Sequence, residues 1–148
     1  MAAGDARTVL AFDYGLRRIG VAAGNTLTRT AQPVATVPAS AGEPDWNAIA
    51  RCVREWSPQV AVVGVPCNMD GSDGPLTARA RAFAAELAAR HALEVHTQDE
   101  RLSSRAAEEE LRRRRASGEL GRRVRRDDVD REAACVLLRQ WFTGPARA

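Results

Sequence analysis

The chain has 148 residues and a formal net charge of +3, with 45% hydrophobic and 5% aromatic residues. This length suits one domain, residues 1–148, whose core needs neither disulfides nor a structural metal for stability. Its three cysteines are odd in number and far apart, and no apolar run approaches the roughly 20 residues that span a bilayer, so we expect a cytoplasmic protein with free thiols and no membrane contact.

All 22 basic residues are arginines, because the sequence contains no lysine. A genome rich in G and C would produce the same bias, so this composition alone does not assign a function. Arginine is nevertheless the better bidentate partner of a phosphate group, which leaves a polyanionic ligand open.

Apolar runs, helical periodicity and turn residues predict an α/β fold with a mixed five-stranded sheet flanked by helices. The short turn at 15–18 makes the first two strands an antiparallel hairpin. We expect loose termini at 1–7 and 144–148, and a mobile basic segment at 116–127. The strands are predicted at 8–15, 19–25, 31–38, 59–66 and 94–100, and the helices at 43–58, 76–93, 104–117 and 130–142.

Acidic residues stand at the ends of predicted strands. Asp13 closes the first apolar strand, and Asp99 and Glu100 close the last one. In a mixed α/β sheet the carboxyl ends of parallel strands form the usual ligand crevice. If the first and last strands are parallel, the carboxylates of Asp13 and Glu100 open into one crevice.

The phase of the last helix selects a third acid, Asp130. Positions four, seven, eight and eleven residues further along share its face of a helix. These positions are all apolar: Ala134, Leu137, Leu138 and Trp141. Asp130 therefore points toward the sheet, whereas Asp128 leads to the polar side, Arg131 and Glu132, and is the better N-cap candidate.

Three carboxylates close together repel one another unless a divalent cation neutralises them. Ligands that are all oxygen favour Mg²⁺ or Mn²⁺ over Zn²⁺, and two such ions can activate water for attack on a phosphodiester. Each acid also fits a local structural role, as a turn residue, an ion-pair partner or a residue favoured by the helix dipole. Spacing alone leaves these alternatives open.

Four sequence blocks resemble, in the same order, the signature blocks of the YqgF/RuvX family, over nearly the whole chain from residue 9 to 142. One departure is Arg131–Glu132, where the family has a small or apolar pair. The four blocks are FDYGLRRIGVA, VVGVPCNMDGSDGP, DERLSS and DDVDREAA.

This resemblance implies an RNase H-like fold related to the RuvC resolvases and a metal-dependent nuclease activity. It places the family's catalytic and metal-binding acids at Asp13, Glu100 and Asp130, with Mg²⁺ or Mn²⁺ as the cofactor. Members of the family are described as nucleases that mature the 5′ end of 16S ribosomal RNA, and also as Holliday junction resolvases.

Several other residues are candidates for contact with a nucleic-acid backbone. Arg17 and Arg18 lie at the hairpin turn, Asn68 lies in a polar loop before a helix, and Arg101 follows Glu100. The basic segment before the last helix has a suitable charge for phosphate contacts. Its candidate residues are Arg122, Arg123, Arg125 and Arg126. For Gly15 and Gly20, which bracket the turn, we favour tight turn geometry over approach to a phosphate.

Our leading hypothesis is a nuclease acting on precursor 16S ribosomal RNA. The first alternative is a resolvase of branched DNA, which would act as a homodimer that cuts two strands symmetrically. The second is a nucleic-acid-binding ribosome assembly factor without catalysis. An ATPase of the actin and sugar-kinase type shares the Asp-x-Gly turn, but it needs two lobes to enclose ATP, and 148 residues supply one.

Overall fold

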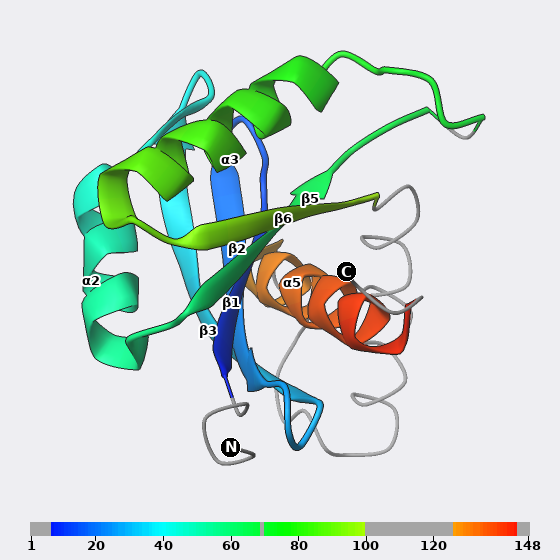
Figure 1. Cartoon of the computed structure of the whole chain (residues 1–148). Helices are drawn as coiled ribbons and strands as arrows, with labels where there is room; N and C mark the ends of the chain where they lie inside the picture. The colour runs from blue at the N-terminus through cyan, green and yellow to red at the C-terminus, as the bar shows by residue number, and fades with distance from the viewer. Residues whose placement is uncertain (1–6, 69, 100–125, 145–148) are drawn as a thin grey trace.

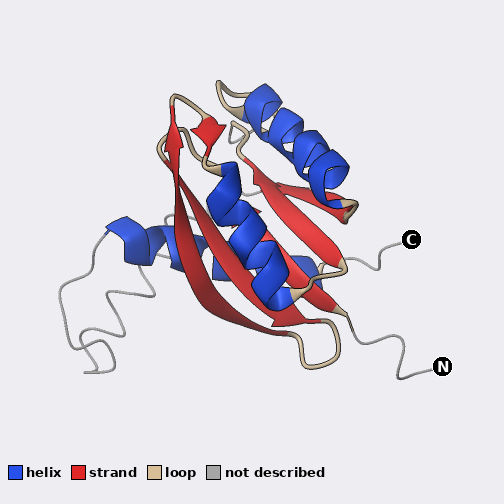
Figure 2. Cartoon of the chain, turned by 90° about the vertical axis from the view of Figure 1, so that its left-hand side faces the viewer, coloured by secondary structure: helices blue, strands red, loops and turns tan. Residues whose placement is uncertain are grey.

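The computed structural model describes residues 7–68, 70–99 and 126–144. Its strands form one sheet in the order β4-β3-β2-β1-β5-β6, and helices cover both faces of it (Figures 1 and 2). The predicted α/β class with a mixed sheet is therefore confirmed. The strands are β1 (Thr8–Asp13), β2 (Arg18–Asn25), β3 (Thr30–Ser40), β4 (Glu43–Pro44), β5 (Val60–Val65) and β6 (Glu94–Asp99), and the described helices are α2 (Trp46–Trp56), α3 (Thr77–His91) and α5 (Arg126–Thr143).

The sheet has six strands rather than the five predicted, because a two-residue strand, β4, pairs with the end of β3. The turn between these strands is made by Ala41 and Gly42, which have φ angles of 51° and 88°. Two consecutive positive φ angles suit a tight hairpin turn. No strong local signal marks this turn, since alanine rarely adopts that conformation.

Strands β1, β5 and β6 are parallel, as the crevice hypothesis required. Helix α3 connects β5 to β6, and β5 is reached from β1 through β2, β3, β4 and α2. Helix α2 begins after Asp45, whose carboxylate accepts hydrogen bonds from the backbone N–H groups of Asn47 and Ala48, and it ends at Ser57 in the left-handed conformation. The carboxyl ends of the three strands consequently meet at one edge of the sheet.

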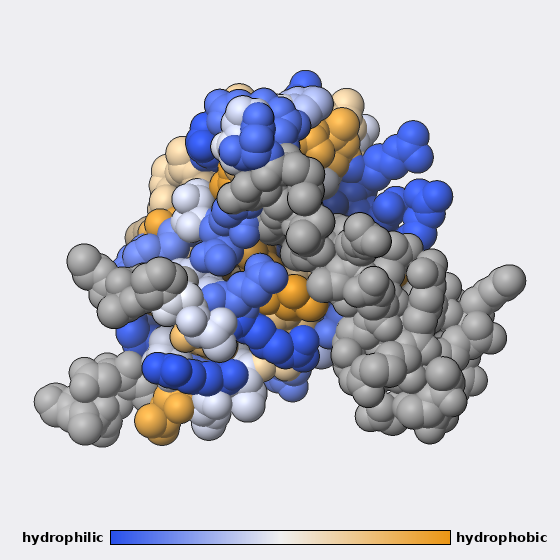
Figure 3. Space-filling view, turned by 90° about the vertical axis from the view of Figure 1, so that its right-hand side faces the viewer, coloured by the Kyte–Doolittle hydropathy of each residue, from blue (hydrophilic) through white to orange (hydrophobic). Residues whose placement is uncertain are grey.

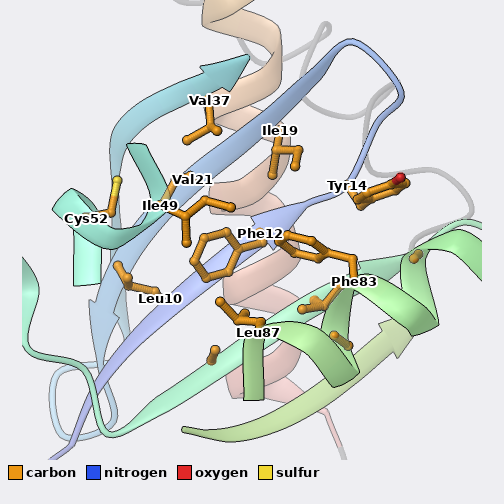
Figure 4. Packing of buried hydrophobic residues seen from close by; sticks show 14 of the residues in the cluster. Leu10, Phe12, Tyr14, Ile19, Val21, Val37, Ile49, Cys52, Phe83 and Leu87 are labelled. Carbon is orange, nitrogen blue, oxygen red and sulfur yellow. The ribbon is translucent and has the colours of Figure 1, made fainter. Parts of the chain in front are cut away.

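Side chains alternate along β1 between two separate cores. Leu10 and Phe12 face α2 and α3, in the cluster shown in Figure 4. Val9 and Ala11 face the opposite way and pack with α5 residues such as Leu137. Because successive strand residues point to opposite faces, Asp13 belongs to the α5 side of the sheet.

The last helix begins earlier than expected, at Arg126 rather than Asp130. The predicted N-cap at Asp128 is wrong, because this residue lies inside the helix, is buried, and pairs with Arg131 at 3.0 Å. Residues 126 and 127 of the predicted mobile segment belong to the helix, and residues 116–125 lie outside the described residues. The predicted helix at 104–117 also lies outside them.

Arg7, the last residue of the leader expected to be loose, is tied to the sheet. Its backbone N–H donates to Thr26 Oγ1 at 3.0 Å, and its guanidinium pairs with Glu94 at 2.6 Å. The rest of the leader, 1–6, lies outside the described residues, as does 145–148.

Candidate active site at the carboxyl ends of the parallel strands

Asp13 is the last residue of β1, at the centre of the sheet. It faces Gly20 in the antiparallel pairing with β2 and Gly64 in the parallel pairing with β5. Both neighbours lack a side chain, so no side chain from the adjacent residues of β2 and β5 flanks this carboxylate. The apolar β1 strand holds Asp13 in position, and the sequence-based placement at the strand end is confirmed.

Asp130 reaches the same place from α5. A Cβ atom at Gly20 would lie only 1.8 Å from the backbone oxygen of Asp130, which means that the helix backbone lies directly over this glycine. Since Gly20 is the cross-strand partner of Asp13, the backbone of Asp130 lies over the residue next to Asp13, although 117 positions separate the two acids in sequence (13 and 130).

The predicted helix phase is confirmed. The four apolar residues that share the face of Asp130 are buried against the sheet: Ala134, Leu137, Leu138 and Trp141. The side chain of Asp130 itself is 19% exposed, so it lies at the boundary between this core and solvent.

Gly20 has a different role from the one expected. It lies inside β2 rather than at the turn, and its missing side chain is what permits the close approach of α5. The sequence contained a signal for this, because a glycine within a strand often marks the close approach of another backbone.

Arg18 forms an ion pair with Asp130, which sequence reasoning missed. The Nε–H of Arg18 donates to Oδ2 of Asp130 at 2.6 Å, and the two side chains are 31% and 19% exposed. Arg18 and Gly20 share one face of β2, the face that α5 covers. No local pattern could reveal a pair whose members are 112 residues apart.

Burial raises the pKa of the Asp130 carboxyl above its usual 3.8. The cause is desolvation, since a carboxylate loses hydration in this half-buried position. The hydrogen bond and positive charge of Arg18 oppose this effect, and they do not fully cancel it.

Two further acids of α5 are buried, Asp128 and Glu132, at 6% and 3% exposure. Glu132 pairs with Arg139 at 3.1 Å, so the expectation that it faces the polar side is wrong. Arg131 also donates to Thr36 of β3 at 3.4 Å, and Thr36 in turn donates to the backbone oxygen of Asp127. These contacts fix the first turns of α5, and hence Asp130, relative to the sheet.

The third predicted ligand, Glu100, lies outside the described residues. The parallel register pairs Gly64 of β5 with Gln98 of β6, and Gly64 also pairs with Asp13. Gln98 is thus in the same row as Asp13, and Glu100 is the second residue after it in the sequence. Arg101, Arg122, Arg123 and Arg125 also lie outside the described residues.

Asn68 follows β5 at the same edge of the sheet as Asp13. Its side-chain amide donates to Ser72 Oγ at 3.0 Å and to the backbone oxygen of Asp73 at 3.1 Å. Thr77 is fully buried, and its hydroxyl donates to the backbone oxygen of Pro66 at 2.6 Å, which stabilises the loop next to the end of β5. The Asn68 amide therefore stabilises its own loop. Arg17, in the turn before β2, and Arg126, the first residue of α5, are both exposed.

The donor set of Asp13 and Asp130 consists only of carboxylate oxygens, which fits a hard divalent cation such as Mg²⁺ or Mn²⁺. Within 7–68, 70–99 and 126–144, no group of three His, Cys, Asp or Glu side chains is arranged to hold a metal ion. A complete site of three acids would therefore need Glu100 or another residue beyond these ranges.

The three cysteines are free thiols, as the sequence predicted. None of the helices in the described part of the chain is both long and apolar enough to cross a membrane. Figure 3 shows one face of the molecule, on which the coloured surface is largely hydrophilic and the hydrophobic areas are small.

Comparison with known proteins supports the sequence resemblance. A profile of the RuvX family, described as Holliday junction resolvase, matches residues 7–144. A Haemophilus influenzae protein named "Putative pre-16S rRNA nuclease" is 42% identical over 135 residues, covering 91% of this chain and 94% of the relative. A protein of the same name from Actinobacillus pleuropneumoniae serotype 5b is 44% identical over 137 residues, covering 93% and 97%.

Solved structures share the fold at low sequence identity. Thermus thermophilus RuvC in complex with a Holliday junction substrate superposes with a TM-score of 0.53 and 17% identity, covering 91% of this chain and 93% of that one. The fowlpox virus Holliday junction resolvase gives a TM-score of 0.56 at 13% identity, covering 91% and 97%. The fold is therefore RuvC-like, and the match over residues 7–144 together with relatives above 40% identity shows that the chain belongs to the RuvX family.

Proposed function

We propose that this protein is a divalent-cation-dependent nuclease that hydrolyses phosphodiester bonds in precursor 16S ribosomal RNA and so matures its 5′ end. The observation that carries the proposal is the close approach of the Asp130 backbone to Gly20, the cross-strand partner of Asp13, at the edge where the parallel strands end. Relatives named for this RNA, at 42–44% identity over most of their length, support the choice of substrate.

In this proposal Asp13, Asp130 and Glu100 hold Mg²⁺ or Mn²⁺. The bound cations would supply an activated water and would stabilise the leaving oxygen of the phosphodiester, as in two-metal nucleases. Asp13 acts as the rigid ligand because an apolar strand holds it. Asp130 is positioned by the packing of α5 on the glycine side of β2.

The nucleic acid would be bound mainly through its phosphates. Arg17 and Arg126 are exposed and available for such contacts. Arg101, Arg122, Arg123 and Arg125 remain predictions of the same kind from the sequence. Binding through arginine and phosphate should weaken steeply as salt rises.

The second candidate function is a resolvase of Holliday junctions in branched DNA. The description of the RuvX family as Holliday junction resolvase favours it. Such an enzyme would be expected to act as a homodimer, since two strands of a junction must be cut symmetrically.

Cleavage of both substrates side by side tests the proposal. The purified full-length chain is incubated with an RNA that carries the 5′ precursor region of 16S ribosomal RNA, and with a four-way DNA junction, in Mg²⁺, Mn²⁺ or EDTA. We expect cation-dependent cleavage of the RNA, and we expect Asp13→Asn to lower the rate by about 100-fold or more, because it removes a charged ligand.

Asp45→Asn is the matched control, because asparagine caps a helix as well as aspartate does and α2 lies on the opposite face of the sheet. This control should cleave at the wild-type rate. Cleavage of the junction alone would replace the proposal with the resolvase. RNA binding without cleavage in any cation would favour the assembly factor.

A further inference from the structure

We infer that Arg18 is the internal counter-ion of Asp130 and that a divalent cation must displace it, so that cation binding transfers the guanidinium from this carboxylate to a phosphate of the nucleic acid. The inference rests on the proposed function and describes the regulation of the same site. It assigns Arg18 as a positioning residue that exchanges partners.

Arg18 and Asp130 are in direct contact. Arg18 Nε and Asp130 Oδ2 are 2.6 Å apart, which is a short charge-assisted hydrogen bond. It joins β2 to α5, which are otherwise held together at this point by the close approach over Gly20. The pair therefore occupies one oxygen of a proposed cation ligand.

The charges of Arg18 and of a divalent cation would act on the same carboxylate. Asp13 is the cross-strand partner of Gly20, the Asp130 backbone lies over Gly20, and Arg18 supplies a positive charge beside the Asp130 carboxylate. A divalent cation at the two acids would supply the same neutralisation and would repel the guanidinium, because both are positive and the position is half-buried. Arg18 and the cation therefore compete for Asp130.

The partial exposure of Arg18 allows its side chain to move. Its side chain is 31% exposed, so its guanidinium can leave Asp130 without opening the core. Arg18 is the first residue of β2 and adjoins the exposed turn that contains Arg17. A phosphate bound at the cation would be its new partner, since guanidinium groups bind phosphate well.

The test compares Arg18→Gln with Arg17→Gln, which removes the same charge from the neighbouring exposed position. Binding of Mn²⁺ to the full chain without nucleic acid is measured by titration calorimetry and by electron paramagnetic resonance of free Mn²⁺. We expect Arg18→Gln to bind Mn²⁺ about fivefold or more tightly than the wild type. Arg17→Gln should change the affinity little, and Arg18→Lys, which keeps the charge, should stay near the wild type.

The second readout is steady-state cleavage of the RNA at saturating Mn²⁺. Arg18→Gln should raise KM about fivefold or more, with a smaller change in kcat. Tighter cation binding together with weaker RNA binding is the signature of partner exchange. A merely structural role of Arg18 would weaken both.

Arg18→Met serves as a second uncharged variant if Arg18→Gln does not fold. Wild-type or weaker Mn²⁺ affinity in the folded uncharged variant, while Asp13→Asn abolishes Mn²⁺ binding, would overturn this inference and leave the proposed function standing. Absence of Mn²⁺ binding by the wild type would overturn both.

Discussion

At the scale of single residues, the candidate site combines Asp13, whose carboxylate is on a rigid strand, with Asp130, whose half-buried carboxylate is on a helix. Asp13 is placed by the strand to which it belongs, whereas Asp130 depends on the docking of α5. Desolvation raises the pKa of Asp130, so its ionised form is disfavoured in the protein without a cation.

This raised pKa gives a prediction for Asp130→Asn. Below the ordinary value of 3.8, the carboxyl is protonated in the folded and unfolded states, so it contributes no pH-dependent difference between the variant and the wild type. As pH rises from 3.8 through the raised pKa, the folded state binds more protons than the unfolded state, and the wild type loses free energy of unfolding. Asp130→Asn should therefore become more stable relative to the wild type as pH rises to neutral.

Urea denaturation over this pH range, without added metal, measures the effect. Asp73→Asn, which makes the same substitution at a carboxylate that is 67% exposed, is the control. A stability difference that does not shift in favour of the Asp130 variant as pH rises would contradict the assigned desolvation.

At the scale of elements, the decisive contact is that between α5 and the glycine side of β2. Gly20 and Gly24 both face α5, and a side chain on either would meet an atom of that helix, the Asp130 backbone or the Leu138 side chain. Gly20 and Gly24, four residues apart on one face of β2, therefore allow α5 to pack close to the strand. The same helix carries the apolar stripe that was predicted from its periodicity.

Gly20→Ala is predicted to displace α5. Its Cβ would lie 1.8 Å from the Asp130 backbone oxygen, so the helix must shift, at a cost of roughly 1–3 kcal/mol or more. Gly74→Ala is the matched control, because its nearest neighbour is the Asn68 side chain at 3.2 Å, which can move. Urea unfolding followed by tryptophan fluorescence measures both, and equal stability of the two variants would show that α5 does not depend on Gly20.

At the scale of the whole molecule, the sheet separates two cores with different tasks. The core under α2 and α3 contains Leu87 and only supports the fold, whereas the core under α5 contains Leu138 and also positions Asp130. Both leucines are fully buried. Loss of packing on either side lowers stability, but only one side adjoins the proposed site.

Leu87→Ala and Leu138→Ala should therefore differ in their response to Mn²⁺. Each should cost about 2–5 kcal/mol of stability, since each removes a buried side chain. Mn²⁺ raises the melting temperature of any form that binds it when folded. We expect this rise to persist in Leu87→Ala and to shrink in Leu138→Ala, as measured by calorimetry, and an equal rise in both would contradict a dependence of the site on the α5 core.

Local patterns were sufficient for the elements whose signals lie within a few residues. The hairpin, the buried strand β5 and the phase of α5 were predicted because side-chain alternation, turn residues and helical periodicity are local. The start of α5 and the strand β4 were not. The first is set by contacts of Arg131 and the Asp127 backbone with Thr36 of β3, and the second by a turn with two positive φ angles.

By itself the sequence determined the fold class, the family resemblance and the position of Asp13 at a strand end, because each depends on residue types and short spacings. Only the tertiary structure decided that Asp130 lies over Gly20 and that Arg18 neutralises it. The physical reason is that this pair and this close contact join positions more than 100 residues apart, and the packing of α5 on the sheet alone brings them within a few ångströms.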